Sequence, residues 1–359
     1  MKTVHIDSSV QMPKSPGPIF IIGAGAIVRD AHLPAYVKAG WNIAGITDPE
    51  QEKAFELAGR YGIKKVYSSI NETAGAAPAN AVFDIAVPAG AITEVISKIP
   101  MGATVMIQKP MGNNIDEATE ILRICKEKKF VAAMNFQKRF IPAILAAKRI
   151  IDSGTIGRLH HIEIRMNIYT PWELWNFLFG LPRMEMLYHS IHYMDLMRYF
   201  LGDPGHVYAK TVKHPHMTQL ASTRSVIILN YGDEIQAFIN TNHNHVFGDK
   251  YQDAFIKWEG TEGAIRHTLG TNINFPHGVP DSFEVSMTED KRGWISYPIE
   301  GKWYPDAFLG SMANLMCVAE GSQTELINSI DSAYRTMQVV EAAYLSSNQQ
   351  GTPVNYDTR

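Results

Sequence analysis

Cysteine is scarce in this chain, since only Cys125 and Cys317 occur among its 359 residues. Two cysteines cannot build a disulfide framework or a cysteine-based zinc site, so we expect free, buried thiols in a reducing compartment. Neither charge sign dominates, because 33 Lys plus Arg residues face 36 Asp plus Glu residues. A net charge of −3 creates no global field for nucleic acid or anionic lipid. The expected partner is therefore a small molecule.

Long hydrophobic runs are also lacking. No stretch of about 18 apolar residues predicts a membrane span. The segment 1–17, MKTVHIDSSVQMPKSPG, has no apolar run after its early lysine, which predicts an irregular N-terminal extension and not a signal peptide. We expect a cytoplasmic protein. Its 359 residues, 45% hydrophobic and 19% charged, predict about two ordinary globular domains.

Residues 18–138 alternate between short apolar runs and helical patterns. The runs expected to form strands are PIFIIGAG, WNIAGITD, KKVYSS, AVFDIAVPA, ATVMIQKP and KFVAAMNF. Segments such as PEQEKAFELAGRYG and NIDEATEILRICKEKK have apolar residues at helical spacing and acids near their starts. Alternating strands and helices predict an α/β domain with a doubly wound parallel sheet, a Rossmann dinucleotide-binding domain.

The pattern changes after Arg139, where strand-like segments follow one another with few helices between them. They are LHHIEIRMN, RSVIILNY, EIQAFINTN, DAFIKWEG and SFEVSMT. For residues 139–359 we expect an α+β domain for substrate binding and oligomerisation, with a large, mostly antiparallel open sheet and a boundary near 138–142. Helices MEMLYHSIHYMDLMRYFLG and SIDSAYRTMQVVEAAYLSSNQQG should cover one face. Its other, exposed face predicts a homodimer or homotetramer.

The first strand of the Rossmann domain ends in a glycine-rich turn at residues 23–28, GAGAIV. Gly23 allows a tight turn, and Gly25 lets backbone amides approach a pyrophosphate at a helix N-terminus. The expected cofactor-binding residues of this turn are Gly23, Gly25, Ala26, Ile27 and Val28. Val28 stands where the dinucleotide fingerprint prefers Gly or Ala, and the motif alone is weak.

Asp48 supports the cofactor assignment, because it ends the second strand about 20 residues after the second glycine. A carboxylate there accepts hydrogen bonds from the adenosine ribose and repels a 2′-phosphate. We therefore expect NAD, with NADP the less favoured cofactor. The alternative is that the turn is merely a tight loop and that Asp48 caps a helix.

Several motifs together resemble the Gfo/Idh/MocA family of sugar and polyol dehydrogenases. They are GAGAIVRDAHLPAY, the strand end DIAVPA with Pro88, the tripeptide Gln108-Lys109-Pro110, LYHSIHYMDL, and the closing segment IDSAYRTMQVVEAAYLSSNQQGTPV. The likeness spans nearly the whole chain after residue 17. It implies hydride transfer between NAD and a secondary alcohol of a sugar, cyclitol or sugar acid, with Pro88, Gln108 and Lys109 at the cofactor.

The resemblance places Lys109 beside both the substrate hydroxyl and the nicotinamide, as a catalytic residue. A lysine that ends the apolar strand TVMIQK also lies at the carboxyl edge of a parallel sheet, where such folds bind ligands. The alternative is a surface lysine whose stem is buried. The family usually has Glu where this chain has Gln108, whose role we leave open.

His192 matches the family's histidine that acts on the reacting hydroxyl, whereas Tyr188 stands where the family has an aspartate. At helical spacing Tyr188, His192 and Asp195 form a polar stripe on an otherwise apolar helix. An imidazole suits acceptance of an alcohol proton. Tyr188 can orient a substrate hydroxyl, but it cannot supply a carboxylate charge.

Further substrate-binding candidates are weaker, and each has a structural alternative. His189 lies three positions before His192 and could instead cap a strand. Asn135 and Arg139 resemble family positions that line the substrate site, but they could be hinge hydrogen bonders. Trp172 and Trp175 could stack on a sugar ring, although core packing is the more common role of such aromatics.

No metal site is expected. The histidine pairs 189/192 and 243/245 lack zinc-protease spacing and an associated carboxylate cluster. Two alternatives to a dehydrogenase remain at this point. One is an enzyme with bound NAD that performs a redox-neutral elimination or hydrolysis, and the other is a non-catalytic, ligand-sensing regulator on the same fold.

Overall fold

The computed structural model of the protein describes residues 4–349 and 351–354. These residues form two compact units. The N-terminal unit consists of Asp7–Ala146 and Glu300–Met337, and the C-terminal unit of Ala147–Ile299 with residues 4–6 and the described residues after Met337. The sequence placed residues 300–337 with the second domain, whereas the structure groups them with the first. Residues 1–3 of the predicted extension, with 350 and 355–359 of the predicted second domain, lie outside the described residues.

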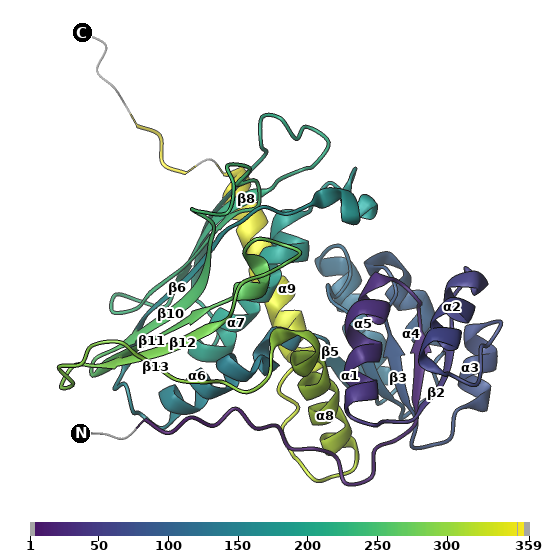
Figure 1. Cartoon of the computed structure of the whole chain (residues 1–359). Helices are drawn as coiled ribbons and strands as arrows, with labels where there is room; N and C mark the ends of the chain where they lie inside the picture. The colour runs from purple at the N-terminus through teal and green to yellow at the C-terminus, as the bar shows by residue number, and fades with distance from the viewer. Residues whose placement is uncertain (1–3, 350, 355–359) are drawn as a thin grey trace. The chain divides into compact units, whose positions relative to one another are not determined.

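The N-terminal unit contains the predicted parallel sheet, and its strand order is β2-β1-β3-β4-β5 in the described part of the chain (Figure 1). The strands are β1 Ile19–Ile22, β2 Ile43–Thr47, β3 Val82–Ile85, β4 Thr104–Ile107 and β5 Val131–Met134. Because β2 and β3 pair on opposite sides of β1, the direction of winding reverses beside β1. Ligands of open α/β sheets bind at such a switch point.

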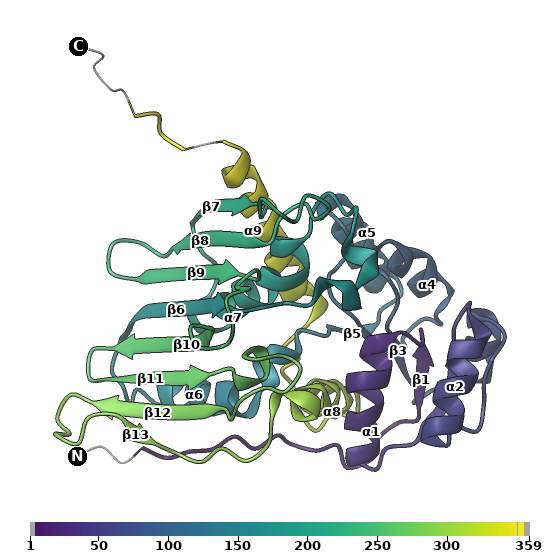
Figure 2. The same cartoon turned by 45° about the horizontal axis from the view of Figure 1, so that its top comes forward.

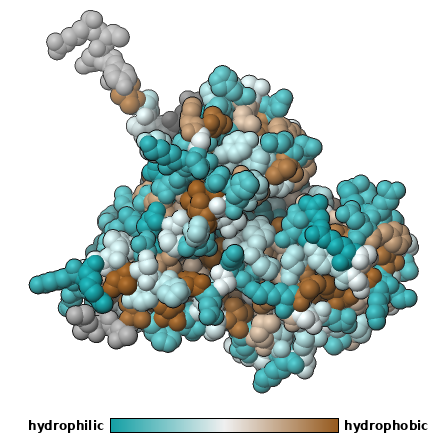
Figure 3. All heavy atoms as spheres, viewed as in Figure 1, coloured by the Kyte–Doolittle hydropathy of each residue, from teal (hydrophilic) through white to brown (hydrophobic). Residues whose placement is uncertain are grey.

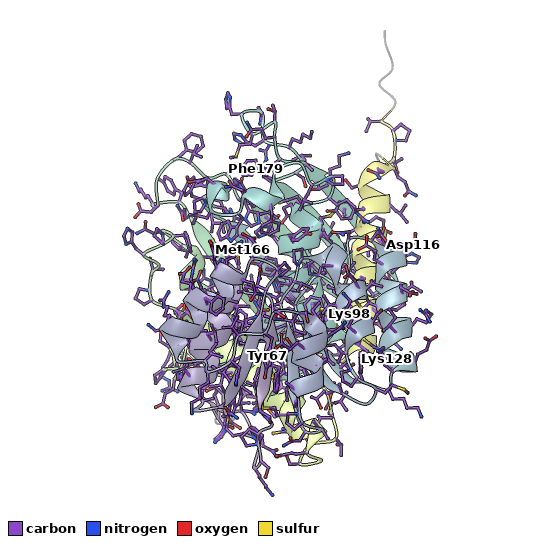
Figure 4. All side chains as sticks on the ribbon, turned by 90° about the vertical axis from the view of Figure 1, so that its right-hand side faces the viewer. Tyr67, Lys98, Asp116, Lys128, Met166 and Phe179 are labelled. Atoms are coloured by element: carbon purple, nitrogen blue, oxygen red, sulfur yellow. The ribbon has the colours of Figure 1, made fainter. Side chains whose placement is uncertain are left out.

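The helices of this unit are α1 Leu33–Lys38, preceded by a π-helical turn Val28–His32, and α2 Gln51–Tyr61, α3 Ile70–Ala76, α4 Ile92–Lys98 and α5 Ile115–Glu127. Some of them have capping residues at their ends, such as the side-chain N-caps of α3 and α5. The Asn114 side chain accepts a hydrogen bond from the Glu117 N–H at the start of α5. Gly62 ends α2 with φ +69°. In Figure 4 Asp116 and Lys128 lie towards opposite ends of α5.

One predicted strand, residues 64–69, is wrong. The structure has only an isolated bridge between Val66 and Ile46 there. The physical reason is the start of α3 directly behind it, where the Ser69 side chain accepts from the Glu72 N–H and Glu72 accepts from Ser68. These contacts at the start of α3 leave too little chain for a ladder.

Residues 300–337 belong to the N-terminal unit because α8, Phe308–Ala319, completes its hydrophobic core. Phe308, Met312 and Met316 are buried in the same cluster as Met106 of β4. α8 is apolar on most of its surface, so it needs cover on more than one side. No local sequence signal says which of two domains supplies that cover.

The C-terminal unit contains an eight-stranded sheet in the order β13-β12-β11-β10-β6-β9-β8-β7, as far as the described residues show (Figure 2). All its pairs are antiparallel except β6 with β9. The strands are β6 Leu159–Asn167, β7 His206–Val212, β8 Arg224–Asn230, β9 Gln236–Asn242, β10 Asp253–Gly260, β11 Gly263–Thr268, β12 Ser282–Met287 and β13 Ile295–Ser296. The predicted architecture is confirmed, although the sequence patterns had not singled out β7, β11 and β13.

Two predicted helices, α7 Ile191–Leu201 and α9 Ile330–Asn348, are present. The C-terminal turns of α9 contact β7, where Ser346 Oγ accepts from the Ala209 N–H. The ring of Phe200 in α7 packs on Trp258 of β10. A further helix, α6 Pro142–Asp152, precedes β6. Alternate residues of β8 are buried under the helices, as the period of two requires.

The opposite face of this sheet is partly apolar. Tyr208, Val226 and Ile228 are 57%, 48% and 45% exposed, and Val226 alternates with the fully buried Ile227. On the side of the molecule seen in Figure 3, hydrophobic and hydrophilic residues are intermixed. Within the described residues, no helix is both long and apolar enough to span a bilayer.

Both cysteines are free and buried, as expected. Burial raises the pKa of the Cys125 thiol to about 12. A thiol with such a pKa is a structural group and a poor nucleophile.

Candidate functional site

The glycine-rich turn follows β1 in the N-terminal unit. Gly23 has φ +107°, and a Cβ there would lie 2.4 Å from the Ala86 carbonyl oxygen, so the position requires glycine. A Cβ on Gly25 would meet nothing within 4 Å. Gly25 and Ala26 are exposed at the start of the helical segment, Ile27 is half-buried and Val28 is buried. The Gly23 N–H donates to the Thr47 carbonyl, so the exposed Gly25 and Ala26 are the positions of the turn where backbone amides can meet an anionic ligand.

Asp48 joins the end of β2 to this turn. Its Oδ2 accepts a hydrogen bond of 2.7 Å from the Ala24 N–H, and its Oδ1 accepts one of 2.8 Å from the Glu50 N–H. Each carboxylate oxygen can accept more than one hydrogen bond. Asp48 is half-buried, so it can hold the turn and still accept from ribose hydroxyls.

Gln108 and Lys109 follow β4 at the same edge of the sheet. The Gln108 N–H donates to the Ile85 carbonyl at 2.8 Å, and its side-chain Oε1 accepts from the Lys109 N–H at 3.1 Å. The Gln108 amide thus orders the backbone of Lys109, a task that the oxygen of a glutamate could also perform. Pro88 follows β3 and precedes a short 3-10 turn, Ala89–Ala91.

Lys109 is the one of these residues with a strongly altered acidity. Its side chain is largely buried, and burial lowers the pKa of its ammonium group to about 8. A lysine with that pKa exchanges protons near neutral pH, which is the property required of an acid–base residue.

Asn135 and Arg139 are both buried and both anchored inside the N-terminal unit. The Asn135 Nδ2 lies 3.2 Å from His32 Nε2. The Arg139 guanidinium donates to the Ile327 carbonyl at 2.5 Å and to Ser332 Oγ at 3.1 Å. These contacts agree with the alternative of internal hydrogen bonders, and substrate binding by either residue stays a prediction.

Behind Asn135 lies a polar network that the sequence analysis missed. His32 Nδ1 lies 2.7 Å from the Asp84 carboxylate, which also accepts from the Tyr36 hydroxyl at 2.8 Å. Burial and the Asp84 charge raise the pKa of Tyr36. The signal was Asp84 itself, a carboxylate within the apolar strand VFDI, because buried acids need donors.

In the C-terminal unit, residues 184–202 do not form the single regular helix that was expected. A π-helical turn, η6 (Glu185–Ser190), precedes α7. Tyr188 and His189 lie in η6 and are partly exposed, whereas His192 lies in the first turn of α7 and is 7% exposed. The wider turn alters the angular spacing between Tyr188 and His192 from that of an α-helix.

Trp172 and Trp175 have different surroundings. Trp172 is fully buried, with its ring centroid 5.1 Å from that of His189 and 5.4 Å from that of His243. It offers no face to a sugar, so the predicted stacking role is wrong for Trp172, and the residue is a core aromatic. Trp175 is partly exposed and lies 6.3 Å from Phe275, so a role in substrate stacking stays a prediction for it.

The structure thus brings Gly23, Asp48, Pro88 and Lys109 to the carboxyl ends of β1, β2, β3 and β4. It separately brings the segment of Tyr188, His189 and His192 to one face of the second sheet. Among the described residues, no group of three or more His, Cys, Asp or Glu side chains could hold a metal ion.

A parallel five-stranded sheet with a glycine-rich turn at its switch point and an acid at the end of β2 is the arrangement of a dinucleotide-binding Rossmann fold. Two family models match the chain: the "Oxidoreductase family, NAD-binding Rossmann fold" over residues 18–136, and the "GFO/IDH/MocA C-terminal domain" over residues 144–266. The chain belongs to the Gfo/Idh/MocA oxidoreductase family, and its cofactor is NAD.

Individual relatives are distant but cover most of the chain. It is 23% identical to scyllo-inositol 2-dehydrogenase (NAD(+)) of Bacillus subtilis, over 89% of this chain and 90% of that protein. It is 23% identical to 1,5-anhydro-D-fructose reductase of Ensifer adhaerens, over 70% and 75% of the two chains. Among solved structures, a levoglucosan dehydrogenase in complex with NADH and levoglucosan has a TM-score of 0.77 at 19% identity, covering 93% of this chain and 98% of that one. These structural likenesses show the fold.

Proposed function

We propose that the protein catalyses reversible, NAD-dependent oxidation of a secondary alcohol on a sugar, cyclitol or sugar acid. The observation that carries the proposal is Lys109, whose pKa is lowered to about 8 at the same sheet edge as the glycine turn and Asp48. An oxidoreductase that removes hydride from a CH–OH group needs a nearby acceptor for the hydroxyl proton. The named activities of the relatives, which act on polyols and sugars, support this substrate class.

The residues of the N-terminal unit fit the cofactor. The open space above Gly25 and the exposed amides beside it suit a pyrophosphate, and Asp48 suits the adenosine ribose. Pro88, Gln108 and Lys109 follow neighbouring strands and would border the nicotinamide. When bound, NAD supplies the hydride acceptor for alcohol oxidation.

In this proposal Lys109 and His192 handle the proton of the reacting hydroxyl. Lys109 in its neutral form accepts it, and His192 binds the same hydroxyl or passes the proton on. Tyr188 and His189 orient other hydroxyl groups of the substrate. The open face of the C-terminal sheet, with Val226 and Ile228, pairs with a second copy of the chain in a homodimer or homotetramer.

The test is NADH formation, followed by absorbance, with a panel of sugars, cyclitols and sugar acids. Oxidation of at least one neutral or acidic polyol with NAD is expected. A redox-neutral enzyme would instead copurify with its cofactor and turn over without net NADH. A regulator would bind a polyol and NAD without turnover, and either result would refute the proposed activity.

A further inference from the structure

Glu185, in the first turn of η6, is a fully buried carboxylate that the proposed reaction does not use. Its Oε1 accepts hydrogen bonds from Ser190 Oγ at 2.7 Å and Thr241 Oγ1 at 3.0 Å, and its Oε2 accepts one from Ser225 Oγ. His243 Nε2 lies 3.3 Å from Oε1. Within the described residues no lysine or arginine forms an ion pair with Glu185. Among the described residues, the negative charge of Glu185 is therefore compensated only by hydroxyl groups and by the imidazole of His243.

The donors around Glu185 keep it ionised. Burial by itself would raise the pKa of its carboxyl, but the interactions with His243, Ser225 and Ser190 lower it below the ordinary value. The charge is also felt nearby, since burial and then Glu185 raise the pKa of Tyr193 and of Tyr344. Burying a carboxylate in its charged form costs free energy, even where hydrogen bonds stabilise the charge. Because the dielectric constant of the protein interior is low, such a charge also has a strong electrostatic effect on neighbouring groups.

His243 lies between Glu185 and Thr170. Its Nε2 is within ion-pair distance of the Glu185 carboxylate, which can only accept hydrogen bonds, so a hydrogen on Nε2 makes this contact favourable. The other nitrogen, Nδ1, lies 3.0 Å from Thr170 Oγ1. His243 is itself buried, so both of its nitrogens face protein groups and neither is open to a ligand.

His189 is the residue through which this buried charge can act on a ligand. Its ring centroid lies 4.8 Å from that of His243, and the buried Trp172 packs against both rings. Unlike His243, His189 is partly exposed. Beside it Tyr188 is also partly exposed and contacts the ring of Phe177, which is 60% exposed. The exposed or partly exposed side chains next to the buried anion thus include an imidazole, a phenol and a phenyl group.

Positive charge near this segment is already engaged. Arg183, two residues before Glu185, forms an ion pair of 2.6 Å with Glu341, and its guanidinium stacks 4.0 Å from the ring centre of Tyr344. A carboxylate on a substrate would therefore face the Glu185 charge without a free arginine from this stretch of chain.

We propose that Glu185, acting through His243, positions His189 to bind a hydroxyl group of the substrate. By the same proposal, these three residues select a neutral polyhydroxylated substrate over one that carries a carboxylate. The inference rests on the function proposed above and narrows its substrate class. Glu185 and His243 are positioning residues, whereas His189 touches the substrate. Two like charges within about 10 Å of each other, at an effective dielectric constant of about 20, repel strongly enough to weaken binding by about tenfold or more.

The experiment measures binding to the NADH-loaded protein by calorimetry, with ligand pairs that differ only in charge. Glucose with glucuronate and galactose with galacturonate are suitable pairs. The neutral member is expected to bind about tenfold or more tightly. Preference for the uronates, equal affinity, or binding of neither member of any pair would overturn the proposal. A clear preference for the neutral sugar without NADH formation would instead refute the proposed activity alone.

Glu185→Gln removes the charge at nearly constant size and should reduce the preference for the neutral sugar at least fivefold. The matched control is Glu234→Gln, an exposed carboxylate of the same unit that pairs with Arg158, which should leave the preference and the NADH affinity unchanged. His189→Ala should weaken neutral-sugar binding about tenfold, since it removes the contacting group. A purely structural role of Glu185 would weaken both members of a pair equally, and that result contradicts the proposal.

Thr170→Val is a second variant that keeps the inference testable if Glu185→Gln does not fold. It removes the hydroxyl at His243 Nδ1 without changing the carboxylate. We expect severalfold weaker binding of the neutral sugar and an unchanged preference over the uronate. Unaltered neutral-sugar affinity in this variant would show that His243 does not position His189.

Discussion

Replacement of Lys109 by methionine should have opposite effects on stability and activity. The folded protein holds the ammonium group in surroundings where its pKa is about 8, against an ordinary value of 10.5. A lysine whose pKa is lowered in the folded state destabilises that state at pH values below its folded pKa of about 8. This destabilisation decreases as the pH rises above 8 and disappears as the pH passes the ordinary pKa of 10.5. A shift of this size corresponds to about 3 kcal/mol, which partial exposure of the side chain reduces to about 2 kcal/mol.

Lys109→Met keeps the length of the side chain and removes the charge. The NAD-free variant should be more stable than the parent by about 2 kcal/mol at pH 7, with the difference approaching zero near pH 10.5. Its kcat should fall about 10²-fold or more, because the proton acceptor is lost. In the parent, the rate of alcohol oxidation should rise with pH and level off above about pH 8.

Urea unfolding at pH 7 and pH 10.5 measures the stability, and NADH formation measures the rate. Lys98→Met is the matched control, because Lys98 is a lysine of the same unit at the exposed end of α4 (Figure 4), paired with Glu94. It should change stability by less than about 0.5 kcal/mol. A Lys109→Met protein that is less stable at pH 7, or that keeps its kcat within threefold, would refute the reasoning.

Three further predictions concern the cofactor, the histidine and the assembly. Asp48→Ser combined with Pro49→Arg should shift the kcat/KM preference towards NADP by at least tenfold, and equal use of both cofactors by the parent would contradict the role of Asp48. His192→Ala should lower kcat about 10²-fold with cofactor affinity nearly unchanged, as fluorescence titration with NADH can check; full activity would remove His192 from the mechanism. Light scattering should show an oligomer that Val226→Lys with Ile228→Lys converts to monomers, and a monomeric parent at micromolar concentration would exclude assembly through this face.

The glycine turn and Asp48 could be found from sequence because their signals are local. A tight turn after a buried strand requires Gly23, and the acid follows at a distance along the chain that one βαβ unit fixes. The ends of α2 at Gly62 and of α5 at Asn114 can also be predicted from the local sequence, because helix capping depends on neighbouring residues. Lys109 could be identified as a candidate from its place at a strand end, but its pKa depends on what covers it.

The sequence by itself therefore predicted the alternation of strands and helices in residues 18–138, apart from the strand at 64–69, and the general form of the second sheet, and it supplied the hypothesis of where the dinucleotide binds. Tertiary structure alone decided that α8 completes the first core, that Trp172 is buried, and that Glu185 meets His243 and Ser225. The physical reason is range: turns, caps and amphipathic periods act between neighbours, whereas the partner of a buried carboxylate comes from a strand about 40 to 60 residues away, and nothing local specifies it.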